Sequence, residues 1–289
     1  MLPKRSFILF GIIAAGLLGQ WGHRYTAVIR YALMGMLFLS WIDSHVSLVT
    51  LAHRKLWYLV GIMVALAIVG FVGFTWIDPQ LGLIAALLAV TPTALAAPVV
   101  TSLVRGQVEF VTASVFITNS LAAVLLPLIL PVVMTQGKGV SGGSILFQTL
   151  VVIALPLALA QGLRRWLPSF AQRVKQLKPL TFYLWLTGLY FASAKAGFFI
   201  RQNEQSLTTL GMMAGVALVL CTLNFGLGRW LGQPSLVQET GQALGQKNTM
   251  LAVWVCLTFL SPTLALGPMF YILFQNLYNA YLLVQVPQR

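Results

Sequence analysis

Five polar side chains gather within ten residues near the C-terminal end of the sequence. The stretch LVQETGQALGQKNTMLAVWVCL holds Glu239, Gln242, Gln246, Lys247 and Asn248, and it then continues as a strongly apolar run. Carboxylate, amide and ammonium groups can hold ions or polar substrates, but at membrane depth they persist only where they line a cavity or find partners. The chemistry of this stretch therefore depends on the elements that surround it.

The composition is that of a polytopic membrane protein of the all-α class. Hydrophobic residues make up 58% of the 289 and charged residues 8%, with a mean hydropathy of +0.87, whereas a soluble domain carries roughly 25% charged residues. The formal charge of +13 does not indicate nucleic acid, because the basic residues stand singly or in small groups between apolar runs. Cys221 and Cys256 lie inside apolar runs and are expected to be free thiols, so we predict neither a metal site nor a cofactor.

We predict ten membrane-spanning helices from apolar stretches of about 20 residues, the length that crosses a bilayer. The first run is interpreted as a span rather than a signal peptide, because it lacks a convincing cleavage site. The connections are short, and the longest polar one, RRWLPSFAQRVKQLKP, is interpreted as a partly amphipathic interfacial segment. The predicted spans lie near residues 7–22, 26–42, 56–76, 81–104, 109–134, 144–163, 180–199, 207–229, 236–259 and 264–286.

The basic residues sort by side of the membrane. Twelve fall on the side of both termini and five on the other, and Lys247 belongs to neither side. Positive charge accumulates in cytoplasmic loops, so we expect both termini in the cytoplasm and the chain in the inner (plasma) membrane of a bacterium. The twelve are Lys4, Arg5, Arg54, Lys55, Arg105, Arg164, Arg165, Arg173, Lys175, Lys178, Arg229 and Arg289, and the five are Arg24, Arg30, Lys138, Lys195 and Arg201.

The fourth and ninth predicted spans are interrupted. The fourth carries Pro92 and Pro98 with Thr93 between them and Thr91 before them, and each proline removes a backbone donor and clashes with the preceding turn. The ninth carries Gly241 and Gly245 in its polar half. These are corresponding positions in an inverted five-plus-five repeat, which we place at residues 1–134 (helices 1–5) and 144–289 (helices 6–10). Paired broken helices mark the central site of many transporters.

Polar residues concentrate in spans 3–5 and 8–10, whereas spans 1, 2, 6 and 7 are more uniformly apolar. We therefore predict a polar core domain of helices 3–5 and 8–10 beside an apolar panel domain of helices 1, 2, 6 and 7. The polar residues outside the two broken helices are Thr112, Ser114, Thr118, Asn119, Ser120, Asn224, Gln275, Asn276 and Asn279.

The same segments resemble the bile acid:sodium symporter family. TPTALAAPVVTSLVRGQVEFVTASVF followed by LLPLILP is similar to that family's fourth and fifth helices. ALGQKNTMLAV is similar to its ninth-helix motif, FQNLYNAYLL is similar to its tenth helix, and Asn224 matches a His-Asn pair in its eighth. The resemblance covers most of the chain. It implies ten helices, a panel and a core domain, crossed broken helices 4 and 9, and carriage of an organic anion such as a bile acid or a small carboxylate.

The sequence departs from the family at the residues that bind sodium. The family's Ser-Asn pair reads Ala97 and Pro98 here, and its shared acidic ligand falls on Ala243. The glutamine of its second sodium site falls on Lys247. A hard cation needs oxygen ligands, which hydrocarbon side chains do not supply. The fifth-helix hydroxyls read Val111 and Val115, and a third-helix glutamine reads Val60.

Lys247 is therefore interpreted as a permanently bound cation that replaces sodium at the crossing point. We expect its ammonium to donate to carbonyls freed at Thr91–Ala97; the alternative is a lysine that reaches the membrane surface or pairs with Glu239. Glu239 itself is expected near the membrane surface, with Arg229 or another basic group as its partner. The candidate substrate- and ion-site residues are Lys247, Asn248, Gln246, Gln242, Glu239, Thr91, Thr93, Ala97, Pro98, Thr112, Asn119, Ala243, Asn224, Gln275 and Asn276.

The function predicted from these features is secondary transport of a small organic anion by alternating access, without sodium coupling. The alternative is a sodium-coupled symporter that binds its ion through backbone carbonyls. An intramembrane enzyme would need a nucleophile with a base or paired carboxylates, and the five acidic residues are dispersed, so we predict no enzyme activity. A channel would need a continuous polar stripe along several helices. The substrate, the coupling ion and the oligomeric state stay open.

Overall fold

The computed structural model describes residues 11–19, 21–25, 27–42, 47–134, 142–202 and 206–285, and every regular element in these ranges is helical. Residues 11–18 form a helix, and a 3-10 turn, η1 (Gly22–Tyr25), follows it. The remaining helices are α2 (Ala27–Ile42), α3 (Leu48–Leu51), α4 (Arg54–Thr75), α5 (Pro79–Val90), α6 (Ala97–Leu103), α7 (Val108–Met134), α8 (Gly142–Trp166), α9 (Pro168–Lys175), α10 (Leu180–Gln202), α11 (Leu207–Gly232), α12 (Val237–Gly245), α13 (Thr249–Phe259) and α14 (Leu266–Val284).

Helical segments lie within each of the ten predicted ranges, and the protein is all-α as predicted. Four described helices are long and apolar enough to cross a membrane by length and composition alone: 54–75, 108–126, 147–166 and 207–232. The interfacial segment predicted between the sixth and seventh ranges contains the short helix α9. The start of the first predicted span, the two chain ends, residue 286, Lys138 and the boundary between the predicted repeats lie outside the described residues.

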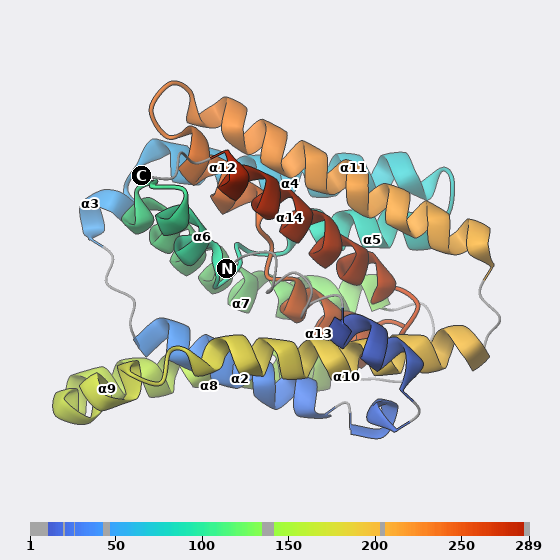
Figure 1. The fold of residues 1–289 in the computed structure, drawn as a ribbon, viewed down its shortest axis with the longest axis horizontal. Helices are drawn as coiled ribbons and strands as arrows, with labels where there is room; N and C mark the ends of the chain where they lie inside the picture. The colour runs from blue at the N-terminus through green and yellow to red at the C-terminus, as the bar shows by residue number, and fades with distance from the viewer. Residues whose placement is uncertain are drawn as a thin grey trace.

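The helices form two layers (Figure 1). In one, α2 packs against both α8 and α10, and α9 extends this layer at the end of α8. In the other, α11 packs against α5, α12 and α14, and α4 packs along α5. The helices α7 and α13 connect the layers, since α7 contacts α8 and α13 contacts α2, α5, α10 and α14.

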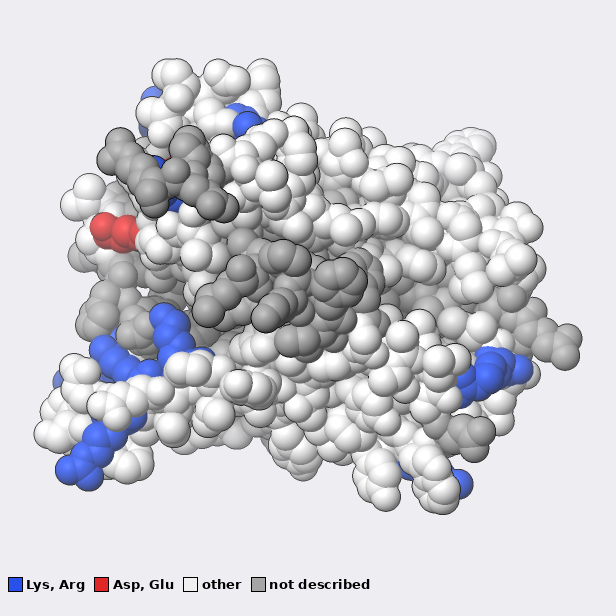
Figure 2. Space-filling view, in the orientation of Figure 1, with Lys and Arg blue, Asp and Glu red and all other residues white. Residues whose placement is uncertain are grey.

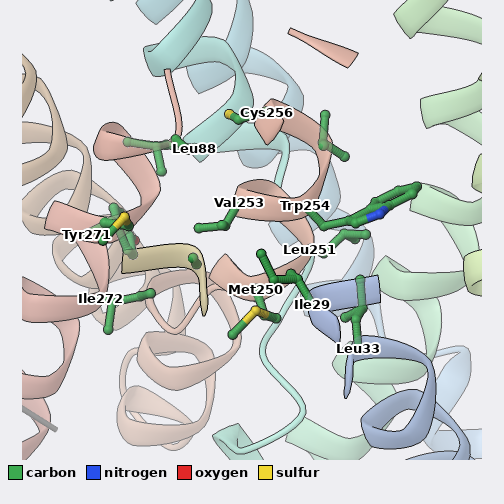
Figure 3. Close-up of a cluster of buried hydrophobic side chains, with 14 of the residues drawn as sticks. Ile29, Leu33, Leu88, Met250, Leu251, Val253, Trp254, Cys256, Tyr271 and Ile272 are labelled. Atoms are coloured by element: carbon green, nitrogen blue, oxygen red, sulfur yellow. The ribbon is translucent and has the colours of Figure 1, made fainter. Parts of the chain in front are cut away.

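Apolar side chains fill the contact between α13 and its neighbouring helices in both layers. Figure 3 shows Met250 and Leu251 of α13 beside Ile29 and Leu33 of α2, all of them buried. On the opposite side of α13 lie Leu88 of α5 and Tyr271 and Ile272 of α14 (Figure 3). The two layers therefore meet through a dry hydrophobic contact.

Both interruptions predicted from the sequence are present. The first separates α5 from α6 at residues 91–96, and the second separates α12 from α13 at residues 246–248. Pro92 ends α5 because it cannot supply the N–H that would bond to the carbonyl of Leu88. Pro98 does not break a helix. It lies in the first turn of α6, where the missing N–H costs nothing.

Gly245 ends α12 where this helix lies against α11. A Cβ added there would stand 2.2 Å from the Cδ1 of Phe225. The absence of a side chain therefore lets α12 approach α11 closely just before the chain leaves the helix.

Candidate functional site

The two interruptions cross each other in the interior. Thr93 and Lys247 form an isolated antiparallel bridge. The N–H of Ala94 donates to the carbonyl of Gln246 at 2.7 Å, and the N–H of Asn248 donates to the carbonyl of Pro92 at 2.7 Å. Two short extended segments from distant parts of the chain therefore satisfy each other's backbone groups.

The crossing leaves carbonyls at the end of each preceding helix without their usual donors. A helix's last carbonyls need partners from outside its own ladder. The N–H of Thr93, which would bond to Ala89 in a continuous helix, instead donates to Thr118 Oγ1 at 3.0 Å. The N–H of Lys247, which would bond to Ala243, instead donates to Gln275 Oε1 at 3.0 Å.

Each interruption then caps the other helix with its own side chain. Lys247 Nζ donates to the carbonyl of Ala89 in the last turn of α5 at 2.8 Å. Thr93 Oγ1 donates to the carbonyl of Ala243 in the last turn of α12 at 2.6 Å. Because a helix C-terminus carries a partial negative charge, a cation beside it is favourably placed. Lys247 places its amino group at this end of α5.

Lys247 is fully enclosed, with 1% of its surface exposed. This burial excludes the alternative of a lysine that reaches the membrane surface. The predicted acceptor range was wrong, because the recorded acceptor is Ala89, two residues before Thr91–Ala97. The ammonium has three donors, and the bond to Ala89 uses one of them.

Amide and hydroxyl groups surround the crossing. Asn119 of α7 donates through Nδ2 to the carbonyl of Thr93 at 3.0 Å, and its Oδ1 accepts from Asn248 Nδ2 at 3.2 Å. Ser114 bonds to the Thr93 hydroxyl at 2.9 Å. The structure thus brings the predicted residues Thr93, Asn119, Gln275, Lys247 and Asn248 together.

A second polar group lies on α11, α12 and α14. Tyr271 donates to the carbonyl of Gly245 at 2.8 Å and accepts from Asn224 Nδ2 at 3.2 Å. Gln242 Nε2 donates to Asn279 Oδ1 at 3.0 Å. Three buried amide oxygens of this region have no hydrogen-bond partner among the described residues: Asn224 Oδ1, Gln242 Oε1 and Gln246 Oε1.

The positions at which the resemblance would place sodium ligands are packed in hydrocarbon. Ala97, Val111 and Ala243 belong to one buried cluster with leucines, Phe110 and other apolar residues of α4, α7 and α12, and Val60 packs against it. Val115 is also buried. No side-chain oxygen is available at these five positions themselves. The hydroxyls of Thr101 and Thr93 beside them donate to the carbonyls of Ala97 and Ala243.

A family model described as the SBF-like CPA transporter family matches residues 44–287, which include both interruptions and every residue of the crossing. This chain belongs to that family. The match confirms the resemblance to bile acid:sodium symporters, identifies an integral membrane protein of a transporter family, and points away from an enzyme. A search of curated proteins found no match.

Glu239 of this SBF-like chain lies at the other end of α12. It is buried within the protein, with 5% of its surface exposed, and its position near the membrane surface stays a prediction. Its Oε1 accepts from the N–H of Gln107 at 2.6 Å, just before α7 begins. Arg229 donates to Gln238 Oε1 at 3.0 Å instead. Glu239 thus joins α12 to the start of α7, away from the crossing.

Four other candidates do not contribute side chains to the crossing network. The hydroxyls of Thr91 and Thr112 donate to carbonyls four residues earlier, and the amide of Asn276 does the same. These bonds satisfy each side chain within its own helix. Pro98 serves as the start of α6.

Sequence reasoning did not select Ser114, Thr118 or Tyr271 as site residues. Ser114 and Thr118 are four residues apart and therefore share one face of α7. Tyr271 likewise precedes Gln275 by four residues on α14. The four-residue spacing from Gln275 was an available signal for Tyr271, but which helix faces meet at the crossing depends on the tertiary fold.

A small cavity borders the crossing between α4, α5 and α7. It has a volume of about 30 Å³, and Val90 and Thr118 line it together with apolar side chains of α4 and α7. This volume is far below that of the pockets that hold organic ligands. An organic anion would need the layers to separate.

Proposed function

We propose that this protein is a secondary transporter of an organic anion that works by alternating access without sodium, and that the ammonium of Lys247 takes the place of the bound cation. In this proposal ten helices form an inverted five-plus-five repeat. The layer of α4–α7 and α11–α14 is the core, and the layer of residues 11–18, α2, α8 and α10 is the panel. Both chain ends face the cytoplasm.

The observation that carries the proposal is the capping of α5 by Lys247. The C-terminal ends of α5 and α12 meet at the crossing, and aligned peptide dipoles make both ends partly negative. The reciprocal bonds from Lys247 to Ala89 and from Thr93 to Ala243 relate the two halves in the way an inverted repeat would. A fixed ammonium there would stabilise the crossing in every step of transport.

The hydrocarbon cluster supports independence from sodium. Sodium binding would require water or oxygen ligands in place of the packed side chains of Ala97, Val111 and Ala243. It would also bring a second positive charge close to Lys247. Both changes oppose cation binding.

An anionic substrate is favoured by two cations in the panel. Arg30 of α2 and Lys195 of α10 are partly buried, and Arg30 Nε is buried without a hydrogen-bond partner in the part of the chain that the structure describes. Lys195 lies two turns after Gly188, where an added Cβ would stand 2.9 Å from the Cε of Met250 in α13. Lys195 therefore occupies the panel face that turns towards α13, and intramembrane charges of this kind often mark a substrate path.

The apolar contact between α13 and α2 is the place where the layers would separate. Met250 and Leu251 contact α2 through apolar side chains, and such side chains make no hydrogen bonds that would fix one layer against the other (Figure 3). Rocking of one layer against the other can expose such a contact from either side in turn.

The second candidate is a sodium-coupled symporter with a displaced ion site. It is favoured by the three buried amide oxygens of Asn224, Gln242 and Gln246 that have no donor. Amide oxygens and backbone carbonyls are ligands that a hard cation accepts.

The experiment is a thermal-shift screen of the purified protein against carboxylates, sulfates and steroidal anions, in sodium and in choline buffer. Anions that raise the melting temperature are then tested for counterflow of labelled anion in preloaded proteoliposomes. Equal counterflow in both buffers supports the proposal. Counterflow that requires sodium supports the second candidate, and stabilisation without counterflow contradicts a carrier.

A further inference from the structure

The segment from the end of α8 to the start of α10 buries small apolar side chains and exposes large ones. The short helix α9 turns Ala171 and Val174 inwards, and it packs against α2 and α8. Two large apolar side chains face outwards instead: Trp166, the last residue of α8, is 77% exposed, and Phe170 of α9 is 53% exposed. Water would disfavour this exposure, whereas the boundary between lipid headgroups and acyl chains accommodates it.

The same segment is strongly basic. Five cations, Arg164, Arg165, Arg173, Lys175 and Lys178, fall within fifteen residues, and the sequence has no Asp or Glu between Glu109 and Glu204. Figure 2 shows Lys and Arg side chains gathered at the end of the molecule where Figure 1 places α9. The side chains of Arg165 and Arg173 are exposed there.

We propose that residues 164–178 form a binding surface for anionic phospholipid headgroups, which we call the α9 surface. Trp166 and Phe170 enter the acyl region, and Arg165 and Arg173 contact the phosphates. Clusters of four to eight basic residues beside a membrane span have the charge complementarity that attracts anionic lipids. Because α9 packs on α2 and α8, lipid bound there would rest on the panel layer. This surface does not depend on what the protein transports.

The test uses Trp166, the exposed tryptophan of the α9 surface. The full chain is reconstituted in phosphatidylcholine vesicles with increasing fractions of brominated phosphatidylglycerol or brominated phosphatidylcholine, and bromine quenches the fluorescence of tryptophans that it touches. Subtracting the signal of Trp166→Phe isolates Trp166. We expect half-maximal quenching of Trp166 at a fraction of phosphatidylglycerol at least roughly tenfold lower than that of phosphatidylcholine.

Matched variants separate the charge of Arg165 and Arg173 from the size of their side chains. The double variant Arg165→Gln/Arg173→Gln should lose most of the preference, and Arg165→Lys/Arg173→Lys should keep it. Arg24→Gln removes another exposed arginine, which stacks over Trp21 at a different place, and should leave the Trp166 signal unchanged. Inorganic phosphate in the buffer should not compete, because it lacks the acyl chains that Trp166 and Phe170 contact.

Equal quenching of Trp166 by the two brominated lipids would overturn the proposal. So would a preference that survives in the glutamine pair, or one that disappears when only inorganic phosphate is added.

Discussion

Replacing Lys247 with methionine separates the charge of this side chain from its volume. Methionine is of similar length, so it can fill the same buried space without the ammonium. The variant loses the bond from Nζ to the carbonyl of Ala89, and a hydrogen bond from a charged group contributes about 1.5–3 kcal/mol. It also removes a buried charge.

The second effect opposes the first. The three described carboxylates bond elsewhere: Asp78 accepts from Gln80, Glu109 from Thr50, and Glu239 from Gln107. A buried ammonium without a carboxylate carries a desolvation penalty of several kcal/mol. The stability lost with the hydrogen bond and the stability gained by removing the desolvation penalty therefore differ by no more than about 2–3 kcal/mol. We expect Lys247→Met to melt close to the wild type but to lose transport.

Lys247→Ala differs from Lys247→Met by the missing volume. Truncating a buried Met-sized side chain to Ala costs about 2–5 kcal/mol through lost burial and the cavity left behind. The alanine variant should therefore melt clearly below the methionine variant, and both should fail to transport. The two variants form a matched pair at one position.

The protein supplies its own probe for the melting experiment. Its two cysteines, Cys221 and Cys256, are free and buried, so a thiol-reactive dye reports unfolding without further engineering. A methionine variant that transports normally would refute a role for the charge. A methionine variant that melts as low as the alanine variant would show that the ammonium, rather than the packing, stabilises the crossing.

Three further predictions test the topology, the ion and the packing. Gln172→Cys on α9 should resist a membrane-impermeant thiol reagent added to intact cells, whereas Gln80→Cys in the first turn of α5 should react. Labelling of Gln172→Cys from outside would show that the protein has the opposite orientation in the membrane. Anion counterflow should change less than about twofold when choline replaces sodium, and abolished counterflow would favour the sodium-coupled alternative. Gly245→Ala should lower the stability by about 1–3 kcal/mol, because its Cβ would stand 2.2 Å from Phe225; an unchanged thiol-dye melting temperature would show that Phe225 moves aside freely.

The two interruptions could be predicted because their causes are local. Pro92 removes a backbone donor wherever it stands in a helix, and the glycine and polar residues before Asn248 weaken the second helix by composition. Their matching positions in the two halves then suggested that they meet. Residues that face the crossing, such as Asn119 and Gln275, followed from the concentration of polar side chains in particular helices.

Contacts between segments that are distant in the sequence could not be predicted in this way. Glu239 was expected to pair with Arg229 or another basic group near the membrane surface. In the structure the turn before α7 offers it the N–H of Gln107, and the start of α12 places it in the first turn of a helix. Negative charge is favourable in that position. The partner comes from a segment 132 residues away, and no local pattern identifies it.

The carbonyl that accepts from Lys247 lies in the last turn of α5 rather than in the unwound segment, and this position has a physical reason. Within the unwound residues 91–96, the carbonyls of Pro92 and Thr93 already accept from the N–H of Asn248 and from Asn119 Nδ2, so the Lys247 ammonium finds its acceptor earlier in the chain. At Ala89 it lies on the last turn of α5, where Pro92 and the diverted N–H of Thr93 have removed the regular donors. Both the free carbonyl and the partial negative charge of the helix end act on the same ammonium. The carbonyl of Ala89 and the end of α5 therefore both favour the amino group of Lys247, whereas the end of α12 is capped by the uncharged hydroxyl of Thr93.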